Sequence, residues 1–335
     1  MKRLFPIFLF ITALLSPCCA QTVPSEALQQ AMQRDETAFL QSMSPTLQHT
    51  QALAVRMAIQ GDARALQQIR ESRNVAPTLP EGVKAVTLTP TMTLFRSTQP
   101  TSKPRPVLLY LHGGGWCFGS INSCMRFCAA VAKRANICVV ALNYRLAPEH
   151  AYPAPIDDCR MAFNYLKGHA AEFGGDTTRV SIGGDSAGGN LAIATAMTVG
   201  GKSSVYSLIP IYPVTELFTR STPSWRTYAQ GYGDDAELLE AFNEAYAAGQ
   251  QQSPLVSVGL ATDETLQQLP PVLLISAGHD ILFDQTAAWA KRLQSLDHPL
   301  SYHVFPTATH LFITVPGQPT AFNESVRIVS EFLKE

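Results

Sequence analysis

Apolar and polar residues follow two different patterns along this chain. Up to about residue 80, apolar side chains such as Leu28 and Met32 recur at helical spacing, and no strand pattern occurs. After a proline-rich break at residues 77–80, short continuous apolar runs alternate with amphipathic stretches. The change predicts a helical N-terminal segment, residues 21–80, that forms part of a cap on a larger domain, residues 81–335.

The larger domain alternates buried strands with helices. Continuous runs of Val, Ile and Leu separated by helices are typical of an α/β fold with a mostly parallel sheet that is covered on both faces. Right-handed crossovers would bring the carboxyl ends of the strands to one edge, where we expect the functional site. The predicted strands are residues 83–88, 92–95, 106–111, 137–142, 179–182, 206–211, 272–276 and 300–305, and the predicted helices are 123–134, 156–167, 187–198, 284–296 and 320–333.

An insertion at about residues 213–269 interrupts this alternation. Within it, residues 235–248 are amphipathic, and one helical face carries Leu238 and Phe242 among its apolar residues. We interpret the insertion and the N-terminal segment together as a helical cap over the carboxyl edge of the sheet.

The strongest motif is Gly184-Asp185-Ser186-Ala187-Gly188-Gly189, which follows a predicted strand and begins a predicted helix. This context is the one that the G-x-S-x-G nucleophile motif requires. The glycines permit a tight turn that exposes the serine hydroxyl, and the helix points its free N–H groups at developing negative charge. The motif also arises by chance in glycine-rich loops, but its position predicts that Ser186 is a nucleophile.

A second glycine-rich loop, His112-Gly113-Gly114-Gly115-Trp116, follows the predicted strand that ends at Leu111. Successive glycines cost backbone entropy, but they let backbone N–H groups approach a ligand closely. An acyl-transfer site needs such donors around an oxyanion. We therefore predict an oxyanion hole formed by Gly113, Gly114, Gly115 and the amide of Ala187. Trp116 and Phe118 are predicted to wall a substrate pocket, with core packing as the alternative, and His112 is predicted to brace the loop.

A serine nucleophile also needs a base and an acid that orients this base. His310 follows the last predicted strand, and Asp280 follows the strand before it, so both would lie at the same edge as Ser186. The chain order Ser, Asp, His is the order expected for such a site. Asp284 is the rival acid, but it falls within the next predicted helix. We predict His310 as the general base and Asp280 as its partner.

Composition narrows the range of partners. The chain has 335 residues, of which 46% are hydrophobic and 15% charged, and its formal net charge is −1. This balance is typical of a globular domain, and it provides no positive field for nucleic acid. No CxxC motif or zinc-finger spacing occurs, so we expect no metal site.

Five of the seven cysteines lie beyond residue 20, and five is an odd number. At least one of these thiols therefore stays free or pairs between molecules. Burial as small hydrophobic side chains is the default for all of them, and a single disulfide in an oxidising compartment stays open. The five are Cys117, Cys124, Cys128, Cys138 and Cys159.

Residues 1–20 are predicted to be a secretory signal peptide. Lys2 and Arg3 precede a short apolar run that ends in small residues at Ala20. The alternative is a lipoprotein acylated at Cys18 or Cys19, which the flanking residues favour less. The signal-like segment therefore predicts a periplasmic or secreted protein, and no later apolar stretch is long enough to span a membrane.

Several stretches together resemble the hormone-sensitive-lipase-like group of esterases over residues 80–335. They are the HGGGW loop at residues 112–116, the GDSAGG motif at residues 184–189 and the NYRLAPE stretch at residues 143–149. The resemblance implies an α/β-hydrolase fold, hydrolysis of short to medium acyl esters, a helical cap and no cofactor. The implied partner is a small-molecule ester.

Two other functions stay open at this point. An amidase or peptidase would use the same three residues, with stronger acid assistance to the leaving amine. A ligand-binding protein on the same scaffold is the non-catalytic alternative, although such proteins usually lack one of the three. The residues do not specify the natural ester or the oligomeric state.

Overall fold

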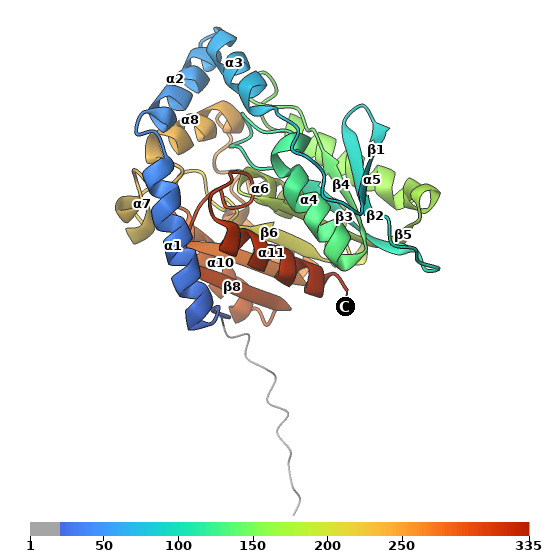
Figure 1. The fold of residues 1–335 in the computed structure, drawn as a ribbon. Helices are drawn as coiled ribbons and strands as arrows, with labels where there is room; N and C mark the ends of the chain where they lie inside the picture. Colours follow the sequence, from blue (N-terminus) through green and yellow to red (C-terminus); the bar gives the residue numbers. More distant parts are fainter. Residues whose placement is uncertain (1–20, 335) are drawn as a thin grey trace, which may run out of the picture.

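An eight-stranded sheet forms the centre of the computed structural model, which describes residues 21–334 (Figure 1). The strand order is β1-β2-β4-β3-β5-β6-β7-β8, and the six strands from β4 to β8 in this order run parallel to one another. β2 is antiparallel to both of its neighbours, β1 and β4. The predicted α/β class is confirmed. The strands are β1 (Val83–Thr89), β2 (Met92–Ser97), β3 (Arg105–Leu111), β4 (Cys138–Leu142), β5 (Gly175–Asp185), β6 (Leu208–Ile211), β7 (Val272–His279) and β8 (Leu300–Thr309).

Helices cover both faces of the sheet, and alternate residues of each strand pack into one of two cores. Leu108 and Tyr110 of β3 belong to the core beneath α4 (Ile121–Ala135) and α11 (Pro319–Phe332). Val107 and Leu109 belong to the core on the other face. This alternation follows from the two-residue period of a strand. The second face is covered by α5 (Ala154–His169), α6 (Ala187–Thr198) and α10 (Phe283–Ser295).

The later helices of the N-terminal segment lie with the insertion at the carboxyl end of the sheet, whereas its first helix lies along the edge strand β8. The segment forms α1 (Glu26–Ser42), α2 (Leu47–Ile59) and α3 (Arg64–Arg73), and α2 packs against α8 (Ala236–Ala247) of the insertion (Figure 1). No helix within residues 21–334 is long and apolar enough to cross a membrane. The predicted signal peptide, residues 1–20, lies outside the described residues and stays a prediction.

Several strands are longer than the sequence pattern predicts, and β5 and β8 exceed their predicted ranges the most. β5 begins at Gly175, five residues before the apolar pattern starts at Val180. The pattern misses this part of the strand because its side chains are mostly polar. β8 continues past Phe305 to Thr309 through Pro306 and Thr307. The short helices α7 (Pro223–Thr227) and α9 (Asp263–Gln267) have five residues each, too few to show a helical period.

The five cysteines beyond residue 20 are all buried and free in the described chain. Cys124 and Cys128 lie on α4, as predicted, and both belong to the core on that face of the sheet. They therefore pack as small hydrophobic side chains.

Candidate active site

Ser186 lies on a strained turn between β5 and α6. Its backbone has φ 55° and ψ −120°, a conformation that costs a non-glycine residue free energy. The turn packs directly against the end of β3: a Cβ atom on Gly184 would lie 2.5 Å from the carbonyl oxygen of Leu111. A Cβ atom on Gly188 would collide with the same carbonyl. The two glycines of the motif are therefore required by this close approach, which holds the serine at the sheet edge.

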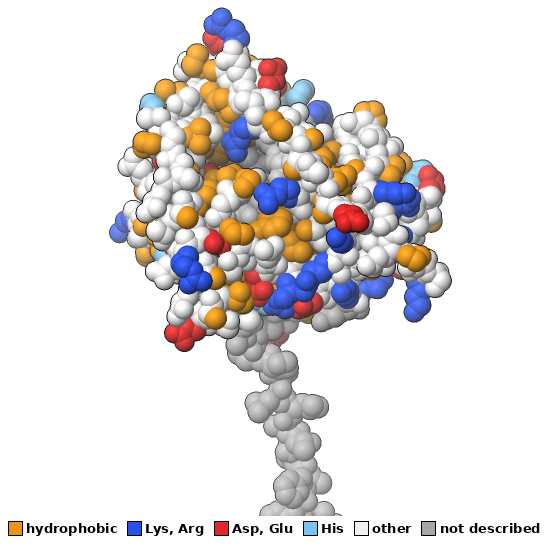
Figure 2. All heavy atoms as spheres, viewed as in Figure 1, with side chains coloured by type: hydrophobic (Ala, Val, Ile, Leu, Met, Phe, Trp, Pro, Cys, Tyr) orange, Lys and Arg blue, Asp and Glu red, His pale blue; other side chains and the backbone are white. Residues whose placement is uncertain are grey.

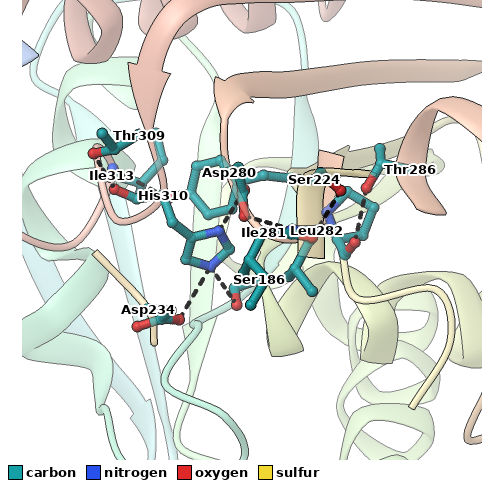
Figure 3. A network of polar contacts seen from close by, with 12 residues as sticks. Ser186, Ser224, Asp234, Asp280, Ile281, Leu282, Thr286, Thr309, His310 and Ile313 are labelled. Carbon is teal, nitrogen blue, oxygen red and sulfur yellow. Dashed lines mark hydrogen bonds and ion pairs between the residues drawn. The ribbon is translucent and has the colours of Figure 1, made fainter. Parts of the chain in front are cut away.

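The structure brings Ser186, His310 and Asp280 into one chain of hydrogen bonds (Figure 3). The Ser186 hydroxyl donates to Nε2 of His310 at 2.8 Å, and Nδ1–H of His310 donates to Oδ2 of Asp280 at 2.6 Å. The second oxygen of Asp280 accepts from the N–H of Leu282 at 2.8 Å, which fixes the carboxylate. Ser186, His310 and Asp280 are 5%, 1% and 1% exposed, so water competes little for these bonds.

The rival acid Asp284 points elsewhere. Asp284 lies on α10, and its Oδ2 accepts a hydrogen bond from the backbone N–H of Ser224 on α7 at 2.7 Å. No contact joins Asp284 to His310 in the described chain. The strand-end argument therefore selected the aspartate that contacts the imidazole.

Carboxylates surround His310 and control its protonation. Burial of the imidazole opposes its charged form, but Asp280, Asp234 and Asp185 favour that form and raise the pKa of His310 to about 9. The ring of Tyr212 packs beside the imidazole, with centroids 4.5 Å apart. The imidazolium that forms during acyl transfer is thus strongly stabilised.

The glycine-rich loop supplies free backbone donors, but from two glycines only. The amides of Gly114 and Gly115 and that of Ala187 donate no hydrogen bond within residues 21–334. The N–H of Gly113 instead donates to Oδ1 of Asp185 at 3.2 Å. The prediction that Gly113 contributes to an oxyanion hole is therefore corrected, because its N–H group is already used to attach the loop to the Ser186 turn.

His112 holds this loop in place, as its position in the sequence indicates. Its Nδ1–H donates to the carbonyl of Gly113 at 2.9 Å, and its ring stacks on Tyr144 with centroids 4.3 Å apart. The Tyr144 hydroxyl donates to the carbonyl of His112 at 2.7 Å. Burial lowers the pKa of His112 to about 4, so this ring is neutral at physiological pH.

A cavity of about 450 Å³ reaches the loop from the side of the N-terminal segment. Its walls include Phe39 of α1, Gly114 and Phe118 of the loop, and Phe242 of α8. The surface is hollowed beneath α3 (Figure 2). Phe118 thus lies where a pocket wall was expected. The cavity size is in the range of small-molecule sites.

Trp116 does not line this cavity, so its predicted role as a pocket wall is corrected. Its indole ring is 1% exposed and stacks on Tyr246 of α8, with ring centroids 4.2 Å apart. The alternative reading, core packing, is the correct one for this residue. The stack fastens the glycine-rich loop to the insertion.

Asp234 is a charged site residue that the sequence did not single out. Its Oδ2 lies 3.5 Å from Nε2 of His310, the nitrogen that also contacts Ser186 (Figure 3). Asp234 lies in the insertion, just before α8, and lines the cavity. Burial raises its pKa. Residues 21–334 contain no group of three His, Cys, Asp or Glu side chains arranged to hold a metal ion.

Comparison with known proteins places this geometry in a family. A family profile described as alpha/beta hydrolase fold matches residues 108–314, more than half of the chain. The chain belongs to the α/β-hydrolase family. Carboxylesterase NlhH of Mycobacterium tuberculosis is 36% identical to this α/β-hydrolase over 214 residues, which cover 62% of the chain. They cover 66% of that relative, slightly less than two thirds of its length.

Two further proteins show the same relationship. Ethyl acetate hydrolase of Pseudomonas putida is 33% identical over 233 residues, which cover 68% of this α/β-hydrolase and 72% of the relative. A solved structure of a fungal esterase from Rhizomucor miehei has a TM-score of 0.71 and 26% identity, over 85% of this chain and 96% of the other. The resemblance to the esterase group is confirmed.

Proposed function

We propose that this α/β-hydrolase is a serine carboxylesterase that forms an acyl-enzyme at Ser186. The observation that carries the proposal is the continuous hydrogen-bond chain from Ser186 through His310 to Asp280. The free backbone N–H groups of Gly114, Gly115 and Ala187 lie beside it. The esterases among its relatives support it. So does the cavity, which opens beside these groups.

The geometry accounts for each step of ester hydrolysis. Ser186 Oγ attacks the ester carbonyl carbon while its proton passes to Nε2 of His310. The resulting oxyanion accepts hydrogen bonds from the N–H groups of Gly114, Gly115 and Ala187. The carbon–oxygen bond to the alcohol then breaks, and the leaving alkoxide takes the proton from His310.

A water molecule completes the cycle. His310 removes a proton from this water, the hydroxide attacks the acyl carbon, and the bond to Ser186 breaks. The proton returns to Ser186, and the products are a carboxylic acid and an alcohol. Asp280 holds the imidazole in the tautomer that both half-reactions require.

Hydrolysis of p-nitrophenyl acetate and butyrate by the enzyme and by Ser186→Ala tests this function. We expect release of p-nitrophenol by the enzyme and a loss of at least a thousandfold in the variant. Short to medium acyl chains should be preferred, because the cavity is small. Equal rates in both proteins, or a preference beyond about twelve carbons, would contradict the proposal.

The raised pKa of His310 predicts an alkaline activity profile. Only the neutral imidazole can accept the Ser186 proton, so kcat/KM for p-nitrophenyl butyrate should rise with pH and reach half its maximum near pH 9. The rate is measured from acid to alkaline pH, with Ser186→Ala as the correction for spontaneous hydrolysis. A half-maximal rate at about pH 6.5, the ordinary pKa of histidine, would show that Asp234 and Asp185 do not raise the pKa of His310.

A further inference from the structure

Asp234 is a buried carboxylate without a hydrogen-bond partner. It is 8% exposed, and within residues 21–334 its only close polar contact is Nε2 of His310 at 3.5 Å. That distance is too long for a hydrogen bond. Buried carboxylates are normally satisfied by donors, since an unsatisfied one costs free energy. Asp234 lines the cavity, so a molecule bound there can supply the missing donor.

The loop that carries Asp234 is held against the site from both sides. Gln48 of α2 donates its side-chain amide to the carbonyl of Gly233. On the other side of Asp234, Oδ1 of Asp235 accepts from the N–H of Gly231 at 2.7 Å. A Cβ atom on Gly233 would be in ordinary van der Waals contact with the carbonyl oxygen of His310, at 3.5 Å, so this loop packs against the His310 backbone. The carboxylate is thus placed by the fold and by both parts of the cap.

Asp234 lies on the side of the imidazole where the alcohol leaves. Asp280 occupies Nδ1, whereas Ser186 and Asp234 both face Nε2 (Figure 3). During acylation the ester oxygen of the alcohol must approach Nε2 to receive its proton. A hydroxyl group on the second carbon from that oxygen, as in the monoester of a 1,2-diol, is then within reach of Oδ2 of Asp234.

The charges around the cavity select a neutral donor. Asp234 and Arg73 are the only carboxylate and the only cation among the residues that line it. An ammonium group beside Asp234 would lie next to the imidazolium that forms on His310, and the two charges would repel each other. A carboxylate or phosphate placed directly beside Asp234 would be repelled by this carboxylate. A hydroxyl group satisfies the carboxylate without either cost.

We propose that Asp234 is a specificity-determining residue for the alcohol part of the ester. It accepts a hydrogen bond from a hydroxyl group on the carbon next to the one that carries the ester oxygen. The preferred substrates are then short-chain monoesters of diols and polyols, in which ester and hydroxyl are on neighbouring carbons. This inference rests on the proposed esterase function and adds the class of alcohol to it. Simple alkyl esters bind without satisfying Asp234 and are poorer substrates.

A matched pair of esters tests this proposal. 2-Hydroxyethyl butyrate and n-propyl butyrate have the same number of non-hydrogen atoms and differ only in a terminal hydroxyl or methyl group. We expect kcat/KM of the enzyme to be about tenfold higher for the hydroxyethyl ester, because the hydrogen bond is made to a charged group. In Asp234→Leu the ratio should fall to about one, and in Asp234→Asn it should be intermediate.

Asp235→Asn is the matched control, because it removes the same charge one residue away, outside the cavity lining, while its Oδ1 can still accept from the N–H of Gly231. It should keep the tenfold ratio. The pH profile of Asp234→Asn on p-nitrophenyl butyrate gives a second readout, since its limb should move to lower pH once this carboxylate is neutral. A merely structural role for Asp234 would lower the rate without moving the limb.

The outcomes separate this inference from the proposed function. Hydrolysis of p-nitrophenyl butyrate with equal kcat/KM for the two matched esters would overturn the role of Asp234 and leave the esterase intact; water would then satisfy the carboxylate. An unchanged ratio in both Asp234 variants would overturn it as well. Failure to hydrolyse any ester would refute the function and this inference with it.

Discussion

Replacing His310 with alanine should lower kcat for p-nitrophenyl butyrate by about 10⁵-fold. The imidazole is the group that accepts the Ser186 proton and returns it to the leaving alcohol, and its Nε2 contacts the Ser186 hydroxyl at 2.8 Å. No other histidine side chain contacts Ser186 in the described chain. Initial rates are compared at the pH at which the unmodified enzyme is most active.

His169→Ala is the control for this variant. His169 is exposed at the end of α5 and contacts Glu172 at 2.7 Å, away from the site. This control should retain the activity of the enzyme. A His310→Ala variant that keeps its fold and more than about a tenth of the activity would exclude His310 as the base.

The second large effect is expected for Asp280→Asn, which should lower kcat about 10⁴-fold. The side-chain amide of asparagine can donate to Nδ1 of His310, which moves the proton to Nε2. Nε2 then cannot accept the proton of Ser186. The steric change is small, and Oδ1 can still accept from the N–H of Leu282, so the fold should be retained.

Asp284→Asn separates the two candidate acids. Its side chain contacts Ser224 and not His310, and asparagine can preserve the bond from the Ser224 N–H. We expect Asp284→Asn to keep most of the activity. A larger loss in Asp284→Asn than in Asp280→Asn would reverse the assignment. Circular dichroism of both variants shows whether either loss comes from unfolding.

The sequence predicts the strands of the sheet from their apolar runs. It also predicts that Ser186, His310 and Asp280 meet, because parallel strands end at one edge of a sheet. Ser186, Asp280 and His310 each follow directly on a strand, so the topology alone brings them together. Their hydrogen bonds require only the local turns that the neighbouring residues specify. A motif at a strand end therefore carries three-dimensional information.

Asp234 could not be found in this way. It lies in the insertion beside Asp235, and no periodicity or motif distinguishes the two carboxylates. Asp235 precedes the first residue of α8 and bonds Gly231, whereas Asp234 faces His310. This difference depends on how the insertion folds back over the sheet. The contact of Asp234 with His310 is long-range in the sequence, so local patterns do not reveal it.

The glycine-rich loop shows the same limit on a smaller scale. Its three glycines look equivalent in the sequence, but the N–H of Gly113 bonds Asp185 while those of Gly114 and Gly115 stay free. Trp116 stacks on Tyr246 from the distant insertion, so its burial follows from a partner that spacing does not reveal. Backbone donors and ring stacks are set by tertiary packing.

Covalent labelling tests most directly whether Ser186 is the nucleophile. The enzyme is incubated with p-nitrophenyl diethyl phosphate, which phosphorylates an activated serine, and the labelled residue is identified by peptide mass spectrometry. We predict one diethylphosphoryl group per molecule on Ser186, loss of p-nitrophenyl butyrate hydrolysis in proportion to labelling, and no label on Ser186→Ala. A label on another residue, or equal labelling of the variant, would contradict the assignment of Ser186 as the nucleophile.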